Sequence, residues 1–345
     1  MSEMNLESYP PVFRQENTII SPKTTTLVLD DGANICEDFQ EHDHHDPLLP
    51  LIDLQCLNLE KLGEACKDWG LFRLVNHGIP STLLSKLEDH SKKLFSLSFE
   101  LKKEVTSATP LSYFWGTPAL TSSGASPLQN INWVEGFNVP LSQLSQFQAE
   151  DPLIDSFRLL LEEYGRHLAR IATTIFEAMA KTLNLNLDQL GSYLSESTGI
   201  VRVYRYPQCS TANETLGMEA HTDSSVLSIL NPEQVGGLEL FKDDKWLPVE
   251  PIPDTLILNI GDMMQAISDD EYKSVMHRVQ ANKDEDRLSI CYFVFPAAGS
   301  VIQSSKYKPF TYKDFQEQVQ QDIKTVGFKV GLEKFKQMQT AEPAS

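Results

Sequence analysis

The residues best suited to carry chemistry are His221 and Asp223, which are two positions apart, and His277, which lies 54 positions after Asp223. Residues i and i+2 of an extended strand point to the same face, so His221 and Asp223 can offer an imidazole nitrogen and a carboxylate oxygen to one point. With a second histidine, this donor set is typical of non-haem Fe(II) sites that keep coordination positions open. A hydrolytic zinc site uses the same ligand types. An isolated His-x-Asp tripeptide also occurs by chance, so other evidence must decide.

That evidence is a second pair, Arg287 and Ser289, which begins ten residues after His277. In a strand the two side chains share a face. A guanidinium group beside a hydroxyl suits the distal carboxylate of a dicarboxylic cosubstrate. An Arg-x-Ser tripeptide is otherwise typical of a protein surface. Here it lies between Val279 and the apolar run ICYFVFP. We therefore expect Arg287 to be partly buried, and a buried arginine needs an anion.

Short strands that alternate with turns must position these residues. From about residue 200 the sequence contains a series of short strand-like runs. They are IVRVYRY, HTDSSVLSIL, GGLELF, KWLPVEP, TLILNIG, KSVMHRVQ and RLSICYFVFP. Gly-Gly, Asn-Pro and Asp-Asp pairs punctuate these runs. Many short strands at regular intervals predict a closed or double-sheet β core such as a jelly roll.

Helices are expected on the outside of this core. The apolar spacing predicts helices over about 58–68, 80–105, 152–184 and 311–327, with strands over 49–54 and 71–78. The helix over 152–184 allows for one break, and its core candidates are Leu159, Leu160, Leu161, Ile171, Ile175 and Met179. Residues 106–132, rich in Ser, Thr, Pro and Gly, are expected to form a long loop of the kind that serves as a lid.

Residues 1–45 are polar and lack a sustained period, so we expect a disordered tail. The tail ends near His42, His44 and His45, where a solvated cluster is expected rather than a metal site. The predicted organisation is one domain over 46–338. It has a mostly helical part (46–190), a jelly-roll core (200–300) and C-terminal helices (311–338).

Composition restricts the classes of partner. The formal net charge is -19, which disfavours binding to nucleic acid, and no run of about 18 apolar residues predicts a membrane span. The five cysteines are widely spaced without a CxxC, which suits a reducing compartment. We expect a monomer in the cytoplasm, or alternatively in the nucleus, that acts on a small molecule.

The chain closely resembles the plant 2-oxoglutarate- and Fe(II)-dependent dioxygenases over about residues 48–335. The likeness is carried by LPLIDL, EACKDWGLFRLVNHGIP, NWVEGF, RVYRYPQC, HTDSSVLSIL, VGGLELF, LILNIGDMMQAISDDEYKSVMHRV and RLSICYFVFP. It implies a double-stranded β-helix, or jelly roll, with helices packed outside. It also implies that His221, Asp223 and His277 bind Fe(II), and that Arg287, Ser289 and Tyr206 bind 2-oxoglutarate. Tyr206 could otherwise be a core tyrosine.

The same resemblance implies an oxidation that consumes O2 and releases succinate and CO2, with ascorbate as a supporting reductant. Departures include Tyr204 and Arg205, which stand where Asn-Tyr is the commonest family pattern. DDEYKSVMHRV and VRVYRYP look closest to the gibberellin oxidases, particularly the 2-oxidases, so a gibberellin or related diterpenoid acid is the expected substrate. An auxin, jasmonate, flavonoid or alkaloid is the alternative.

A substrate of this kind needs an apolar pocket with a cation near its rim. The candidate residues are Phe114, Trp115, Trp133, Phe137, Phe293 and Phe295, with Arg205 or Arg73 as carboxylate partners, although each aromatic also suits a core. Two rival functions remain open at the level of sequence. A non-catalytic binding protein would be expected to have lost a metal ligand or the Arg-x-Ser pair, and both are intact. A metal-dependent hydrolase would have no need of the Arg-x-Ser pair.

Overall fold

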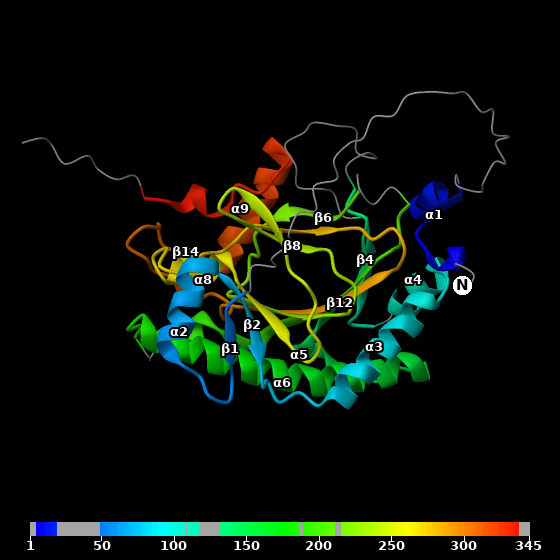
Figure 1. Ribbon diagram of the computed structural model, residues 1–345, viewed down its shortest axis with the longest axis horizontal. Coiled ribbons are helices and arrows are strands. Elements are labelled where there is room, and N and C mark those ends of the chain that lie inside the picture. The colour runs from blue at the N-terminus through cyan, green and yellow to red at the C-terminus, as the bar shows by residue number, and fades with distance from the viewer. Residues whose placement is uncertain are drawn as a thin grey trace, which may run out of the picture.

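Strands from both halves of the chain form the centre of the protein in the computed structural model, which describes residues 5–18, 49–107, 109–116, 131–186, 189–210 and 215–337 (Figure 1). In these residues the larger sheet contains, in spatial order, β1 (Leu51–Asp53), β2 (Leu71–Val75), β10 (Leu256–Ile260), β7 (Leu227–Pro232), β12 (Arg287–Phe295), β5 (Ser195–Tyr206), β4 (Glu135–Pro140) and β3 (Ser112–Trp115). The smaller sheet contains β6 (Leu216–His221), β11 (His277–Gln280), β8 (Leu238–Lys242) and β9 (Lys245–Pro248). A further pair joins β13 (Val301–Ile302) to β14 (Phe310–Thr311).

The larger and the smaller sheet pack face to face, which confirms the predicted jelly-roll core. Apolar residues from both sheets form one buried cluster between them, including Leu71, Ile257, Leu238 and Val279. Sheets packed this way bury their inner faces and leave a space that side chains or ligands fill. Strand β12 shows the two environments by alternation. Its residues Leu288, Ile290, Tyr292 and Val294 join the helix-side core, while Arg287, Ser289, Cys291 and Phe293 face the inner space.

Helices cover the outer face of the larger sheet. They include α3 (Ser81–Ser96), α5 (Leu141–Leu144) and α6 (Pro152–Thr182), of which α6 packs on β5, β7 and β12. The body of the protein also contains α2 (Leu59–Glu64), α4 (Phe99–Ser107), α7 (Leu190–Tyr193) and α8 (Asp262–Ile267). Helix α9 (Tyr312–Val326) lies elsewhere, where its residues line a cavity beside His221 and Asp223. A π-helical turn, Ala65–Trp69, extends α2, and a 3-10 turn, Gly331–Phe335, follows α9. Helices α3 and α6 lie side by side beneath the sheet (Figure 1).

The sequence determines both the start and the buried face of α6. Asp151 caps it by accepting hydrogen bonds from the backbone N–H groups of Leu153 at 2.8 Å and Ile154 at 3.1 Å, and Pro152 occupies the first turn. The helix runs unbroken to Thr182, so the break that we allowed for does not occur. Among the predicted core residues of α6, Leu159 is an exception because it is 51% exposed.

The expectation of a disordered tail is wrong for residues 5–18. A 3-10 turn, Leu6–Ser8, and helix α1 (Pro11–Thr18) pack on the body of the protein. Phe13 is fully buried, and the centroid of its ring lies 4.0 Å from that of Trp133. A polar segment becomes ordered here because a few aromatic side chains find apolar partners far away in the sequence. The histidines at 42, 44 and 45 lie outside the described residues.

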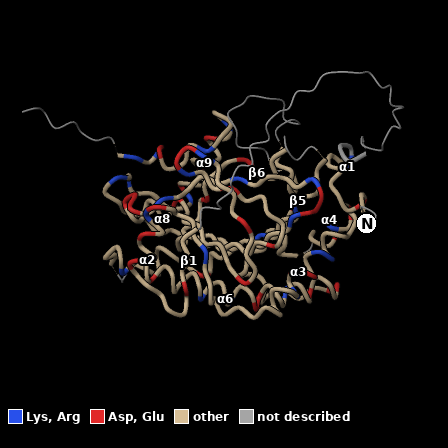
Figure 2. Tube along the Cα trace, in the orientation of Figure 1, with Lys and Arg blue, Asp and Glu red and all other residues tan. Residues whose placement is uncertain are grey.

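The loop predicted over 106–132 is interrupted by regular structure near its N-terminal end. Helix α4 continues to Ser107, and β3 pairs with β4 through Phe114 opposite Gly136. Residues 117–130 lie outside the described residues, so the proposed role as a lid stays a prediction. Acidic and basic residues both occur along the outer helices and loops (Figure 2). In the described part of the chain, no helix has the length and apolar character needed to cross a bilayer.

Candidate active site

His221, Asp223 and His277 meet at one point in the inner space. The Nε2 atoms of both histidines lie 3.8 Å from Oδ1 of Asp223, and the two imidazole centroids are 4.3 Å apart. One donor atom from each residue lies within 4.8 Å of the other two. Two imidazole nitrogens and one carboxylate oxygen at this spacing suit a transition-metal ion, with the remaining coordination positions open.

The histidines are brought together by strand pairing, whereas Asp223 is held in another way. His277 of β11 stands directly opposite His221 of β6. Asp223 lies two residues beyond the end of β6, so the single strand that we predicted for HTDSSVLSIL is wrong. Its backbone carbonyl accepts a hydrogen bond from the N–H of Asp262 at 2.8 Å, and its Oδ2 accepts one from Nδ2 of Asn259 at 2.6 Å. These two hydrogen bonds hold Asp223 in place of the strand-to-strand hydrogen bonds that would hold a residue within a sheet.

The protonation states also favour ligation. The Nδ1 atoms of His221 and His277 lie 2.7 Å and 3.2 Å from backbone carbonyl oxygens of Glu219 and Val275, which they satisfy as N–H donors. This tautomer leaves Nε2 free to bind a metal. Burial, with the adjacent His277, lowers the pKa of His221 to about 4, so its imidazole is neutral at physiological pH. Burial opposes ionisation of Asp223, but the adjacent imidazoles lower its pKa overall.

A small cavity of about 60 Å³ adjoins the three residues and contains the predicted cosubstrate pair. Its lining includes His221, Asp223, His277, Tyr206, Arg287 and Ser289. Arg287 is only 2% exposed, and among the described residues its Nε and Nη1 atoms have no hydrogen-bond partner. Tyr206 stands opposite Arg287 in the sheet, and the guanidinium carbon lies 5.0 Å from the centroid of its ring. Unpaired buried donors of this kind call for an anion.

A larger cavity of about 470 Å³ shares Tyr204, Met218, His221, Asp223 and Phe293 with the small one. Of the predicted substrate residues, Phe114, Phe293 and Phe295 line it. Sequence reasoning missed two cations in its wall, Arg202 and Lys329, and a row of α9 residues, Tyr312, Phe315, Gln316, Val319, Gln320 and Ile323.

The period of a strand could have identified Arg202. It shares a face of β5 with Tyr204 and Tyr206, whereas Arg205 falls on the other face. No comparable signal marked Lys329, because its place depends on how the C-terminal segment folds back over the cavity.

Four predicted substrate residues do not line the cavities. Phe137 is fully buried against Phe95, at 5.0 Å between ring centroids, and Trp115 packs on Phe13. The indole N–H of Trp133 donates to the carbonyl oxygen of Pro207 at 2.8 Å. These aromatics belong to the core because their neighbours in space are apolar.

The fourth residue is Arg205. The alternative carboxylate partner, Arg73, donates instead to the backbone carbonyl of Glu250.

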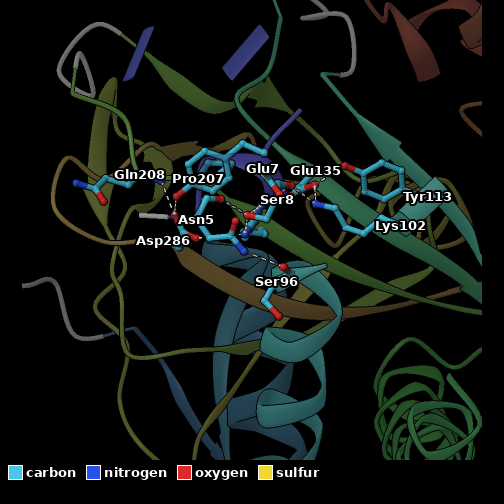
Figure 3. Close-up of polar contacts among 12 residues, drawn as sticks. Asn5, Glu7, Ser8, Ser96, Lys102, Tyr113, Glu135, Pro207, Gln208 and Asp286 are labelled. Carbon is cyan, nitrogen blue, oxygen red and sulfur yellow. Dashed lines mark hydrogen bonds and ion pairs between the residues drawn. The ribbon is translucent and has the colours of Figure 1, made fainter. Parts of the chain in front are cut away.

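Arg205 takes part in a separate buried cluster with the N-terminal segment. Figure 3 shows Ser8, Lys102, Tyr113 and Glu135 of this cluster. Arg205 pairs with the carboxylate of Glu135, which also pairs with Lys102 at 2.5 Å and accepts a hydrogen bond from Tyr113. Ser8 supplies acceptors to both cations, with its carbonyl oxygen 2.6 Å from Nζ of Lys102 and its Oγ 3.2 Å from Nη1 of Arg205. Burial lowers the pKa of Lys102 to about 8. The charges in this cluster satisfy one another.

Comparisons with known proteins agree with this geometry. The family model for the 2OG-Fe(II) oxygenase superfamily matches residues 197–296, and that for the N-terminal region of the non-haem dioxygenases in morphine synthesis matches residues 49–155. The chain is 35% identical to gibberellin 2-beta-dioxygenase 6 of Oryza sativa subsp. japonica, over 92% of this chain and 90% of that protein. It is 36% identical to gibberellin 2-beta-dioxygenase 8 of Arabidopsis thaliana, over 80% of each chain.

A solved structure supports the same grouping. The crystal structure of JOX2 in complex with 2OG, Fe and JA has a TM-score of 0.71 and 27% identity, and the match covers 84% of this chain and 89% of that chain. The chain belongs to the 2OG-Fe(II) oxygenase superfamily. It is therefore an oxidoreductase that uses Fe(II) and 2-oxoglutarate. The donor set of two histidines and one aspartate fits the metal, and the unpaired donors of Arg287 fit a carboxylate.

Proposed function

We propose that the chain oxidises a mostly apolar carboxylic acid of the gibberellin type, with Fe(II) bound by His221, Asp223 and His277. The observation that carries the proposal is one small cavity lined both by these three residues and by Arg287, whose Nε and Nη1 atoms have no hydrogen-bond partner among the described residues. When bound, Fe(II) and 2-oxoglutarate supply the oxidising chemistry, in which O2 is consumed, one oxygen atom enters the substrate, and succinate and CO2 are released.

The residues of the chain bind, orient and exclude water. Arg287 donates to the distal carboxylate of 2-oxoglutarate, and Ser289, on the same face of β12, adds a hydroxyl. Tyr206 closes the same cavity, where burial raises the pKa of its phenol to about 12, so it stays a neutral hydrogen-bonding group. Apolar side chains between the sheets keep water from the reacting atoms.

The larger cavity supplies the substrate site. Phe114, Phe293 and Phe295 offer the apolar wall that a polycyclic skeleton needs. Lys329 is paired with Asp262, whereas no acidic side chain among the described residues pairs with Arg202. The guanidinium carbon of Arg202 lies 5.2 Å from the centroid of the Phe293 ring, and its Nε donates to Asn138 at 3.0 Å. We therefore assign the substrate carboxylate to Arg202 in place of Arg205. The curated gibberellin dioxygenases named above support a gibberellin as the substrate.

A product screen tests the substrate. The purified chain, with Fe(II), 2-oxoglutarate and ascorbate, is incubated with gibberellins, indole-3-acetic acid, jasmonic acid and a flavonoid. We expect a gibberellin to gain one oxygen atom in step with succinate formation, measured by mass spectrometry. Oxidation of another compound in the panel, with every gibberellin untouched, would overturn the substrate assignment and leave the reaction class intact.

The role of Arg202 has a more specific test. Hydrogen bonds to charged groups contribute about 1.5–3 kcal/mol, so Arg202→Leu should raise the KM for the acid about tenfold or more. The KM for the methyl ester of the same acid should change little. Arg166→Leu on α6 is the control, because the side chain of Arg166 is 70% exposed. An equal loss for acid and ester would show that Arg202 shapes the wall without binding the carboxylate.

A further inference from the structure

The segment that follows α9 carries Lys329 to the wall of the larger cavity. Helix α9 ends at Gly327, whose φ of 85° lies in the left-handed region that glycine adopts without strain. The chain then turns back, and Oδ2 of Asp322 accepts hydrogen bonds from the backbone N–H groups of Val330 and Gly331, each at 3.0 Å. Farther on, Lys308 and Phe335 are joined by a backbone hydrogen bond of 2.8 Å. The segment is thus anchored independently of the Lys329 ammonium group.

The Lys329 ammonium group contacts three acceptors around one short peptide. It donates to the backbone carbonyl of Thr222 at 2.9 Å and to Oγ of Ser224 at 3.1 Å, and it pairs with the carboxylate of Asp262. The Lys329 and Asp262 side chains are only 10% and 6% exposed. Hydrogen bonds to a buried ammonium group are stronger than those of neutral donors, so these contacts restrain the peptide that they hold.

The residue between Thr222 and Ser224 is Asp223. Asp223 lies beyond the end of β6, so the sheet does not fix its backbone. The N–H of Asp262 donates to the carbonyl of Asp223 at 2.8 Å, and the next residue, Met263, donates to the carbonyl of Ser225 at 3.1 Å. Lys329 therefore holds the metal-facing peptide directly, and it also holds Asp262, which contacts the same peptide from α8.

We propose that Lys329 is a positioning residue for the metal, which it serves by holding the Thr222–Ser224 peptide so that Asp223 faces His221 and His277. The inference rests on the metal role proposed above for these three residues. Through Lys329, docking of the C-terminal segment against the cavity also sets the affinity of the site for its metal. Groups that orient metal ligands in this way typically contribute about 10–100-fold in metal affinity.

The test measures binding of Co(II) alone, without turnover. Lys329→Met should weaken Co(II) binding about 10–100-fold. Lys329→Arg keeps donors for the same acceptors and should lie closer to the wild type than Lys329→Met does. Lys334→Met is the matched control, because Lys334 is an exposed lysine of the same segment. Wild-type Co(II) affinity in Lys329→Met, or an arginine variant as weak as the methionine variant, would overturn the proposal.

A second variant covers the case in which Lys329→Met folds poorly because Asp262 is left buried without a cation. Lys329→Met/Asp262→Asn removes both charges and keeps the backbone N–H of residue 262. We expect this double variant to melt close to the wild type and still bind Co(II) weakly. A folded double variant with wild-type affinity contradicts the proposal. If His277→Ala also binds Co(II) normally, the metal site itself is misplaced, and the two failures are thereby distinguished.

Discussion

Arg205 and Arg287 lie on neighbouring strands and are almost equally buried, yet they belong to different kinds of polar cluster. Arg205 is 5% exposed and Arg287 is 2% exposed. In the pairing of β5 with β12, Arg287 stands opposite Tyr206, the residue after Arg205. Because side chains alternate along a strand, Arg205 points to the outer face and Arg287 to the space between the sheets.

The difference lies in what the protein supplies to each guanidinium group. Arg205 has Glu135, Ser8 and Asp286 around it, and the N-terminal segment completes the set. Arg287 has two donor atoms without a partner among the described residues. A buried cation whose partners all come from the chain is part of the folded structure, whereas one left unpaired reserves its donors for a ligand. Burial and charge alone do not distinguish a site from a structural cluster.

The largest effect is expected from breaking the satisfied cluster. Arg205→Met leaves Glu135 with less compensation, and removal of one partner from a buried ion pair typically costs about 3–5 kcal/mol. We expect the free energy of unfolding, measured by urea denaturation, to fall by about that amount. The KM for 2-oxoglutarate should not change under conditions where the variant is folded. A raised KM in fully folded protein would remove the distinction between the two clusters.

Arg287→Met should have the opposite pattern. A charge-assisted carboxylate contact is worth about 1.5–3 kcal/mol, so the KM for 2-oxoglutarate should rise about 10–100-fold. The free energy of unfolding without cosubstrate should stay level or increase, because an unpaired buried charge has been replaced by an apolar chain of similar length. Steady-state kinetics measures the KM for 2-oxoglutarate, and denaturation without 2-oxoglutarate measures the free energy of unfolding. A destabilised apoprotein with a normal KM would mean that Arg287 is structural.

The smallest effect is expected at the two serines beside these arginines. Ser289→Ala removes one neutral hydroxyl, worth about 0.5–1.5 kcal/mol, and should raise the KM for 2-oxoglutarate several-fold without changing stability. Ser8→Ala is the matched change, because Oγ of Ser8 lies 3.2 Å from Nη1 of Arg205. It should lower stability by a similar amount and leave the KM alone. Calorimetry and steady-state kinetics on both variants provide the check, and interchanged effects would contradict it.

The sequence predicted the parts of the molecule that depend on local pattern. The spacing of His221, Asp223 and His277 indicated a shared metal site, and the Arg-x-Ser pair and the family resemblance placed Arg287 beside it, although Asp223 lies beyond the strand that we expected to carry it. The long helix and the helix ending near Val326 followed from apolar periodicity. The alternation in β5 also contained the signal for Arg202, which we passed over in favour of Arg205.

The sequence could not predict features that depend on contacts between residues far apart in the chain. Phe13 orders the N-terminal segment only because Trp133 and Trp115 lie together in the fold. Lys329 comes to Thr222 across 107 positions of sequence. Aromatic residues such as Phe137 suit a core and a pocket equally well until their neighbours are known.

The most direct test of the central claim is an anaerobic titration of Fe(II), in the presence of 2-oxoglutarate, into the wild type and His277→Ala. We expect the wild type to bind one metal ion per chain. The variant should melt at a similar temperature but bind at least about 100-fold more weakly, since even residues that only orient metal ligands contribute 10–100-fold. A folded His277→Ala protein that binds Fe(II) as tightly as the wild type would contradict the assignment of His221, Asp223 and His277 to the metal.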